Sequence, residues 1–171
     1  MADVTLSHSG GNLVLGEVPA TVGSSGLLIG NLLKDTDHVT LDYGFMNTAS
    51  CTSAITYIDG DQGILRYRGY PIDQLAENST FLETSYLLIY GELPNAAQLA
   101  QFESQIGMHT MVHEDLRRFF DGFPRDAHPM PVLSSAVSAL STFYQDSLDP
   151  FDPQQVEIST IRLMAKVPTL A

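Results

Sequence analysis

One stretch of the sequence, residues 55–73, constrains the fold more than any other. Two short runs rich in β-branched and aromatic residues flank an Asp- and Gly-rich turn at residues 59–63, which is typical of a β-hairpin whose glycines adopt positive φ. Gly69 is expected to break the second strand, and Pro71 suits the first position of a helix because its φ is already fixed. Asp73 then places a carboxylate near the positive end of that helix. The stretch therefore predicts a hairpin followed by a change to helical structure.

The residues before this hairpin carry only short apolar patches, at positions 13–15 and 27–29, with glycine-rich segments between them. Such spacing predicts brief strands and turns in a flexible arm. Residues 39–43 alternate loosely between apolar and polar side chains, so they are expected to form one more strand.

Helix start and stop signals follow the hairpin. Thr80 with Glu83 forms a capping-box pattern, in which the first side chain accepts a bond from a backbone N–H and the second reaches back. Asn95 and Gln98 repeat this pattern. Gly91 lies between the two and is expected to end the first helix.

Apolar periodicity predicts the remaining helices. The helix after the second capping box should be interrupted at Gly107, and residues 108–120 predict a second helix or a kinked continuation. Residues 133–144 match the i, i+3, i+4, i+7 pattern of a further helix. Asp152 is a good N-cap for the last helix, which shows no stop signal before Ala171. We therefore expect the chain to be the front part of a longer protein.

These patterns together predict a mainly α-helical chain with a small β-containing region in front. Its expected organisation is a flexible arm with short strands at residues 1–50, a β-hairpin at residues 51–70, and a helical part at residues 71–171 that is truncated at its C-terminal end.

The charge balance excludes several classes of partner. A net charge of -12 with only eight basic residues disfavours binding to nucleic-acid backbones and to anionic membrane faces. No segment approaches the roughly 20 continuous apolar residues of a membrane helix, and the start lacks the pattern of a secretory signal. The single Cys51 fits a reducing compartment and is expected to be a small buried residue. A soluble cytoplasmic protein is the expectation.

Two pairs of residues could carry chemistry. His109 and His113 stand four apart and could chelate a transition metal on a helix, but a third ligand is not identifiable, so we predict no metal site. Arg162 and Lys166 are also four apart and repel each other on one helix face. That repulsion suggests either an anion nearby or a solvated face. Taken alone, these residues name no reaction.

Several runs of sequence, taken together, resemble the amino-terminal part of bacterial, Gram-positive-like citrate synthases. The most specific are NTASC at 47–51 and ITYIDGDQGILRYRGYPI at 55–72. The others follow in the family's order: ETSYLL at 83–88, GELP at 91–94, HTMVHE at 109–114, RDAHPM at 125–130, FYQDSLD at 143–149 and RLMAKVPT at 162–169. The resemblance covers the chain from about residue 40 to its end.

The resemblance implies the amino-terminal part of a helical large domain and assembly as a homodimer or hexamer. It implies condensation of acetyl-CoA with oxaloacetate to citrate and CoA in the tricarboxylic acid cycle, with no cofactor. The family's catalytic residues lie beyond position 171, so His109, His113 and His128 are assigned no catalytic role, and the fragment alone is expected to be inactive. The alternatives are a 2-methylcitrate synthase fragment, which would use propionyl-CoA, and a non-catalytic oligomerisation or regulatory module.

The resemblance also implies one candidate site inside this chain. Some relatives bind the inhibitor NADH at a subunit surface, and the matching positions here are His109, Thr110, Tyr144, Arg162 and Lys166. A basic pair that holds phosphates is physically sensible. Those relatives have an arginine where this chain has Met108, so one positive charge is absent. The alternative is that these residues only pack a subunit interface.

Overall fold

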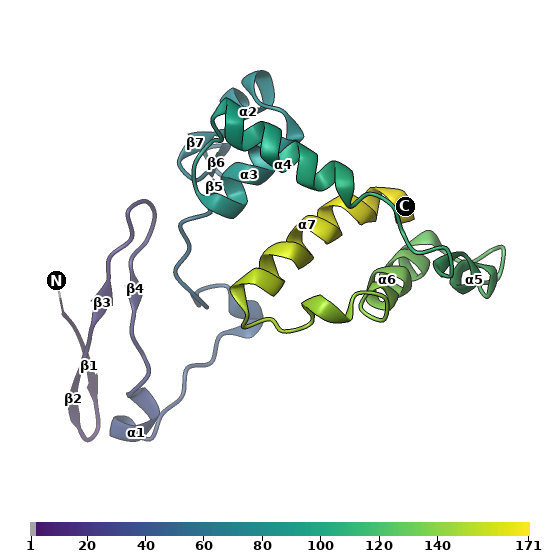
Figure 1. Cartoon of the computed structure of the whole chain (residues 1–171). Coiled ribbons are helices and arrows are strands. Elements are labelled where there is room, and N and C mark those ends of the chain that lie inside the picture. Colours follow the sequence, from purple (N-terminus) through teal and green to yellow (C-terminus); the bar gives the residue numbers. More distant parts are fainter. Residues whose placement is uncertain (1–2) are drawn as a thin grey trace. The chain divides into compact units, whose positions relative to one another are not determined.

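The structure is a computed structural model that describes residues 3–171, and the chain divides into two compact units, Met1–Ile72 and Asp73–Ala171. Helices hold 46% of the residues and strands 14%, which confirms the mainly α-helical prediction. Figure 1 shows the order of the elements along the chain. The boundary between the units lies close to the end of the predicted hairpin, while the three-part division of the chain stays a prediction.

The first unit begins with short antiparallel strands. Strand β1 (Val4–His8) pairs with β2 (Gly11–Leu15), and β3 (Glu17–Val18) pairs with β4 (Gly26–Leu27). A single helical turn, α1 (Leu32–Thr36), follows. The brief strands predicted around residues 13–15 and 27–29 are thus present, the second one shorter than expected.

The strand predicted at residues 39–43 is wrong. The chain there has no regular structure until the 3-10 helix η1 (Tyr43–Phe45). The reason is the Asp42 carboxylate, which accepts hydrogen bonds from the backbone N–H groups of Met46 and Asn47 and from the Thr48 hydroxyl. Such local bonds from an aspartate to its own loop favour a turn over a strand.

The predicted hairpin is present. Strand β5 (Thr56–Asp59) pairs antiparallel with β6 (Ile64–Tyr67), with Asp59 opposite Ile64. In the turn between them only Gly63 has positive φ, at 66°, so the same expectation for Gly60 is wrong. The hairpin carries a third strand that the sequence did not predict, β7 (Tyr70–Pro71).

Pro71 has a different role from the predicted one. It is the last residue of β7, opposite Arg66, and the helix α2 (Ile72–Asn78) starts one residue later. Proline fits a short edge strand because its missing N–H faces no partner strand. Gly69, with φ of 90°, ends β6 as expected by forming the tight turn into β7.

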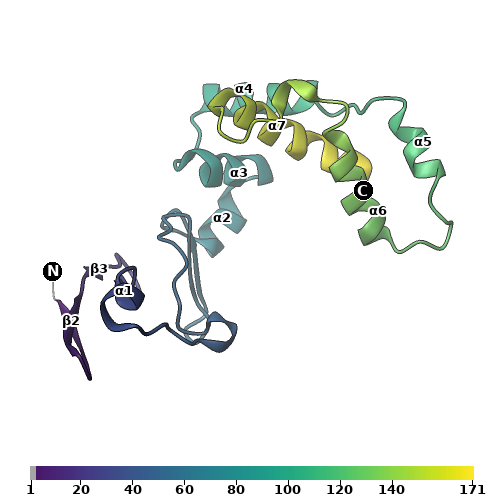
Figure 2. The ribbon, with the colours of Figure 1, turned by 90° about the horizontal axis from the view of Figure 1, so that it is seen from below.

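The regular elements of the second unit are all helices. Its further helices are α3 (Phe81–Tyr90), α4 (Ala96–Met108), α5 (Leu116–Asp121), α6 (Pro129–Leu140) and α7 (Pro153–Leu170). Helix α7 contacts both α4 and α6, while α3 packs on α4 and α5 on α6. Figures 1 and 2 show α7, in yellow, beside these neighbours. The longest helix is therefore the one around which this unit is organised.

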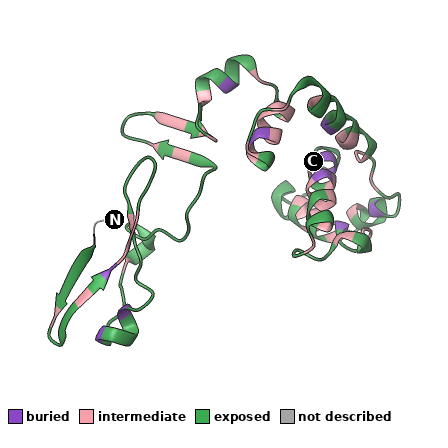
Figure 3. Ribbon diagram, turned by 60° about the vertical axis from the view of Figure 1, so that its left-hand side comes forward, coloured by how far each residue is buried: buried purple, intermediate pink, exposed green. Residues whose placement is uncertain are grey.

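Each helix of the second unit contributes one or two buried apolar side chains to its core. Figure 3 colours the buried positions purple. Leu87 from α3 and Phe102 from α4 are almost fully buried, and so is Leu116 from α5. Ile161 and Ala165 are the buried apolar side chains of α7. Their spacing of four residues puts both on one face of that helix.

Both capping boxes are confirmed. The Thr80 hydroxyl accepts from the Glu83 backbone N–H at 3.2 Å, and Glu83 Oε2 accepts from the Thr80 N–H at 2.7 Å. Asn95 and Gln98 make the same reciprocal pair. Gly91 ends α3 with φ of 94°, as predicted.

Two helix ends differ from the prediction. Helix α4 continues through Gly107 to Met108, and residues 109–115 are non-helical before α5 begins. Helix α6 stops at Leu140, four residues before the predicted end at residue 144. The hydroxyls of Ser141 and Thr142 bond back to carbonyls of the last turn of α6, which tightens and ends it.

Candidate functional site

A polar cluster forms where two basic side chains of α7 meet the ring of Tyr144. Arg162 and Lys166, one helical turn apart, both approach this ring, and the guanidinium carbon and the ammonium nitrogen each lie 4.8 Å from its centre. Aromatic faces attract cations, so one ring stabilises two positive charges that would otherwise repel each other.

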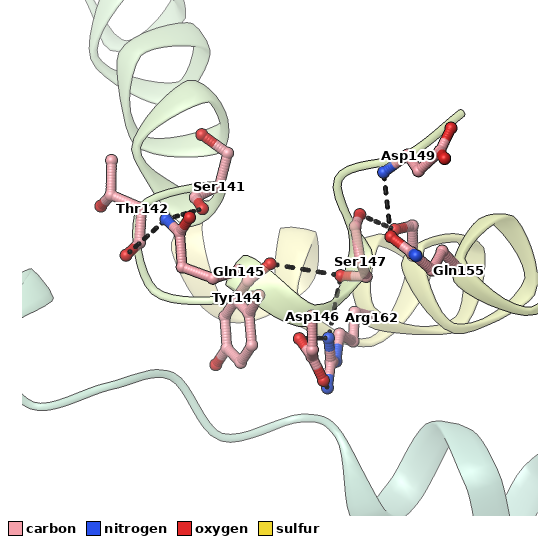
Figure 4. A network of polar contacts seen from close by, with 10 residues as sticks. Ser141, Thr142, Tyr144, Gln145, Asp146, Ser147, Asp149, Gln155 and Arg162 are labelled. Atoms are coloured by element: carbon pink, nitrogen blue, oxygen red, sulfur yellow. Dashed lines mark hydrogen bonds and ion pairs between the residues drawn. The ribbon is translucent and has the colours of Figure 1, made fainter. Parts of the chain in front are cut away.

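Arg162 forms a bidentate ion pair with Asp146. Its two terminal nitrogens donate to the two carboxylate oxygens at 2.6 and 2.8 Å, and Nη1 also donates to the Ser147 hydroxyl at 2.9 Å. Figure 4 shows the guanidinium against the short 3-10 helix η2 (Gln145–Ser147). The Arg162 side chain is 16% exposed and that of Asp146 is 65% exposed, so the pair lies at the edge of the solvent.

This ion pair changes the acidity of both partners. The hydrogen bonds from Arg162 lower the pKa of Asp146 below its ordinary value of 3.8. The same bonds raise the pKa of Arg162 above its ordinary value. Both groups are therefore charged at neutral pH. The anion expected near the basic pair is the Asp146 carboxylate of the chain itself.

Ser147 connects η2 to α7 a second time. Its backbone carbonyl accepts from the Ser159 hydroxyl at 2.8 Å, while its own hydroxyl receives the bond from Arg162. The turn after α6 is thus fixed to the middle of α7 by side chains from two positions of that helix.

Lys166 is buried, with only 2% of its surface exposed. Its ammonium donates to the backbone carbonyls of His109 and Met111, at 2.6 Å in each case. One turn further on, the Thr169 hydroxyl donates to the carbonyl of Thr110 at 2.9 Å. Three consecutive carbonyls therefore accept bonds from α7, and the solvated-face alternative is wrong for Lys166.

The structure brings the five predicted NADH positions together, but two of them only through their backbone. Tyr144, Arg162 and Lys166 contact one another with their side chains. His109 and Thr110 take part through their carbonyl oxygens. Sequence reasoning missed Asp146, Ser147 and Thr169. Only the packing of α7 shows that Arg162 contacts Ser147, 15 positions earlier, and that Thr169 contacts Thr110, 59 positions earlier.

The two histidines considered for a metal lie outside any helix, so their four-residue spacing no longer places them on one face. The ring of His113 stacks on Phe143 with 5.0 Å between centroids, and its Nδ1 accepts from the Asp115 N–H. Within residues 3–171, no group of three or more His, Cys, Asp and Glu side chains could hold a metal ion. No helix in this described part is long and apolar enough to cross a membrane. Cys51 is exposed, so the prediction that it is buried is wrong.

Comparison with known proteins decides the family. The model described as "Citrate synthase, C-terminal domain" matches residues 44–171. The chain belongs to the citrate synthase family. Among curated relatives, Citrate synthase 1 of Mycobacterium tuberculosis is 67% identical over 98% of this chain, and citrate synthase of Corynebacterium glutamicum is 52% identical over 97%. The resemblance stated from the sequence is thereby confirmed.

Solved structures of the family have the same fold. Citrate synthase from Thermotoga maritima matches 77% of this chain with a TM-score of 0.63 and 28% identity. The enzyme from Pyrobaculum aerophilum matches 98% of the chain with a TM-score of 0.63 and 26% identity. A Thermoplasma acidophilum citrate synthase, solved with carboxymethyl coenzyme A and oxaloacetate, has a TM-score of 0.69 at 20% identity, which supports the fold alone.

The chain spans only part of these proteins. It covers 39% of the mycobacterial relative, 38% of the corynebacterial one, and 33 to 37% of the three solved chains.

Proposed function

We propose that this chain is a segment of a citrate synthase, an enzyme that condenses acetyl-CoA with oxaloacetate and water to give citrate and CoA. The observation that carries the proposal is 67% identity over 98% of the chain with a mycobacterial citrate synthase. The relatives reported above are named citrate synthases, so the 2-methylcitrate and non-catalytic alternatives are not favoured. Homo-oligomeric assembly and a cytoplasmic location belong to the same proposal.

In this proposal the segment is a scaffold that carries no catalytic group. Its most organised polar cluster joins α7 to two loops through internal bonds. The cations of that cluster hold the chain's own oxygens, which is the work of a structural element. The 171-residue chain alone is therefore expected to release no CoA.

A chimera tests this function. Residues 1–171 replace the matching segment of the mycobacterial citrate synthase, and free thiol is measured with acetyl-CoA and oxaloacetate as substrates, and with propionyl-CoA in parallel. We expect CoA release from acetyl-CoA by the chimera and none by the 171-residue chain. A correctly folded chimera without activity would contradict the proposed function, and CoA release by the chain alone would contradict its scaffold role.

NADH as an effector is a second candidate, favoured by the convergence of Arg162 and Lys166 on Tyr144. Binding its diphosphate requires both cations to leave their present partners, so we propose a weak site. NADH fluorescence is titrated against the chain, its Arg162→Gln variant and, as a control, its Arg117→Gln variant, whose side chain is 81% exposed in α5. Saturation that is lost only in Arg162→Gln supports the site, and no saturable signal below millimolar NADH rejects it.

A further inference from the structure

We propose that Lys166 selects between two conformations of residues 109–115: the interrupted form of this structure and a helix that runs from α4 into α5. The apolar spacing of residues 108–120 favours a helix, yet the segment is non-helical. A conflict between local preference and the observed conformation calls for a tertiary cause. The bonds that α7 makes to this segment supply one.

The carbonyl groups show how α7 opposes the helix. In a continuous α-helix the carbonyls of His109, Thr110 and Met111 would accept from N–H groups four residues later. In the structure the first and third accept from Lys166 Nζ, and the second accepts from the Thr169 hydroxyl. Three successive acceptors are thus engaged from outside the segment.

The Asp115 N–H group, at the far end of the segment, has a substitute partner. The Asp115 N–H, which would bond to the Met111 carbonyl in a helix, donates to His113 Nδ1 at 3.1 Å. The stacking of His113 on Phe143 holds that ring in place. The Asp115 N–H is therefore satisfied by the His113 side chain, which is held in turn by Phe143, just after α6.

The end of α4 is closed in the same way. The His109 N–H bonds to the Ile106 carbonyl at 3.1 Å, which is the tighter 3-10 pattern. The Thr110 hydroxyl donates to the Gly107 carbonyl at 3.1 Å. Each backbone group in these bonds also has a partner available in the helical alternative, so neither conformation is excluded by local chemistry.

Lys166 decides because its charge is buried. An ammonium removed from water is very costly unless polar groups surround it. Among the salt bridges of residues 3–171 none includes Lys166, and its partners are two carbonyls and the face of Tyr144. In a continuous helix the carbonyls of His109 and Met111 would lie about 200° apart around the helix axis, so one ammonium could not bond to both. The buried Lys166 ammonium keeps both partners only in the interrupted form.

The experiment replaces this charge by a side chain of similar length. Backbone 13Cα shifts and amide hydrogen exchange of residues 109–115 are measured in the 171-residue chain and in Lys166→Met. The chain's other lysine, exposed Lys34, provides the matched control Lys34→Met. We expect helical 13Cα shifts and slowed exchange of residues 113–115 in Lys166→Met only. Coil-like shifts of residues 109–115 in a folded Lys166→Met variant overturn the proposal, whatever their exchange rates.

A second variant tests the proposal even if Lys166→Met does not fold. Gly107→Ala with Thr110→Ala raises the local helix propensity and removes one side-chain bond that ends α4, while Lys166 is kept. A methyl group at position 107 meets nothing within 4 Å. We expect residues 109–115 to remain non-helical in this double variant. A helix there in the presence of Lys166 shows that local sequence decides, and the proposal fails.

Discussion

At the scale of single residues, the two basic side chains of α7 hold loops in place. Arg162 binds a carboxylate at the surface, whereas Lys166 is buried among carbonyls. The first arrangement is a partly solvated ion pair, whose contribution to stability is modest and sensitive to salt. The second cannot be weakened by salt in the same way, because water and ions do not reach it. Lys166 is therefore the more consequential of the two residues.

The Asp146–Arg162 pair makes stability depend on pH in the acid range. Because the folded-state pKa of Asp146 lies below its ordinary value of 3.8, its stabilisation is fully present above that value and is lost as pH falls through the lower folded pKa. We expect Asp146→Asn to lower the free energy of unfolding at pH 7 and to have less effect at pH 3. Urea unfolding at both pH values measures this.

Asp126→Asn is the control for that measurement, since Asp126 is exposed. It is expected to change stability little at either pH. An equal loss from Asp146→Asn at pH 7 and at pH 3 would mean that the charge of Asp146 contributes nothing.

At the scale of elements, the helix ends depend on a few residues whose chemistry is local. The two capping boxes satisfy backbone N–H groups at the starts of α3 and α4, and Gly91 closes α3 in a left-handed conformation. The glycine at 107, by contrast, lies inside α4 with helical geometry. Gly91 thus needs a backbone conformation that favours glycine, whereas Gly107 does not.

Replacement of these two glycines by alanine should change the free energy of unfolding in opposite directions. Gly91 has φ of 94°, which costs an L-residue about 1 to 2 kcal/mol, so Gly91→Ala is expected to destabilise the chain by that amount. Gly107→Ala meets no atom within 4 Å and is expected to stabilise α4 by up to about 1 kcal/mol. Denaturant unfolding compares the variants. Destabilisation by both would show that Gly107 is required for the break after Met108.

At the scale of the whole molecule, many large apolar side chains are exposed to solvent. Phe151 is 91% exposed, Met111 is 79% exposed, and Phe81 and Phe45 are each 78% exposed. Large contiguous patches of exposed apolar side chains mark interaction surfaces in soluble proteins. The family members matched are longer, and this chain spans 39% of the mycobacterial relative and 33% of the Thermotoga maritima chain.

The isolated chain is accordingly expected to self-associate. Apolar surface removed from water contributes about 25 cal/mol per Å², so contacts between exposed patches are favourable at moderate concentration. Light scattering across a concentration series should show a rising mean mass, and a hydrophobic dye should bind. Phe151→Ser, at the most exposed of these side chains, should reduce both signals. A constant monomer mass without dye binding would contradict the expectation.

The sequence by itself determined the features whose chemistry lies within a few residues. The hairpin at 56–67 follows from its strand formers and glycine turn, and each capping box from two residues three apart. The runs of residues that resemble citrate synthases were also complete in the sequence, and the family followed from them.

Only the tertiary structure decided where tertiary contacts override the helical periodicity of the sequence. It also decided which groups bind Arg162 and Lys166. Residues 109–115 have helical spacing, but their carbonyls bond to Lys166 and Thr169, which are 55 or more positions away. Likewise Arg162 finds its anion in Asp146, 16 positions earlier, on a turn that exists because α6 ends at Leu140. Local propensity is worth a few tenths of a kcal/mol per residue, whereas an unpartnered buried charge costs far more, so the contacts of α7 prevail.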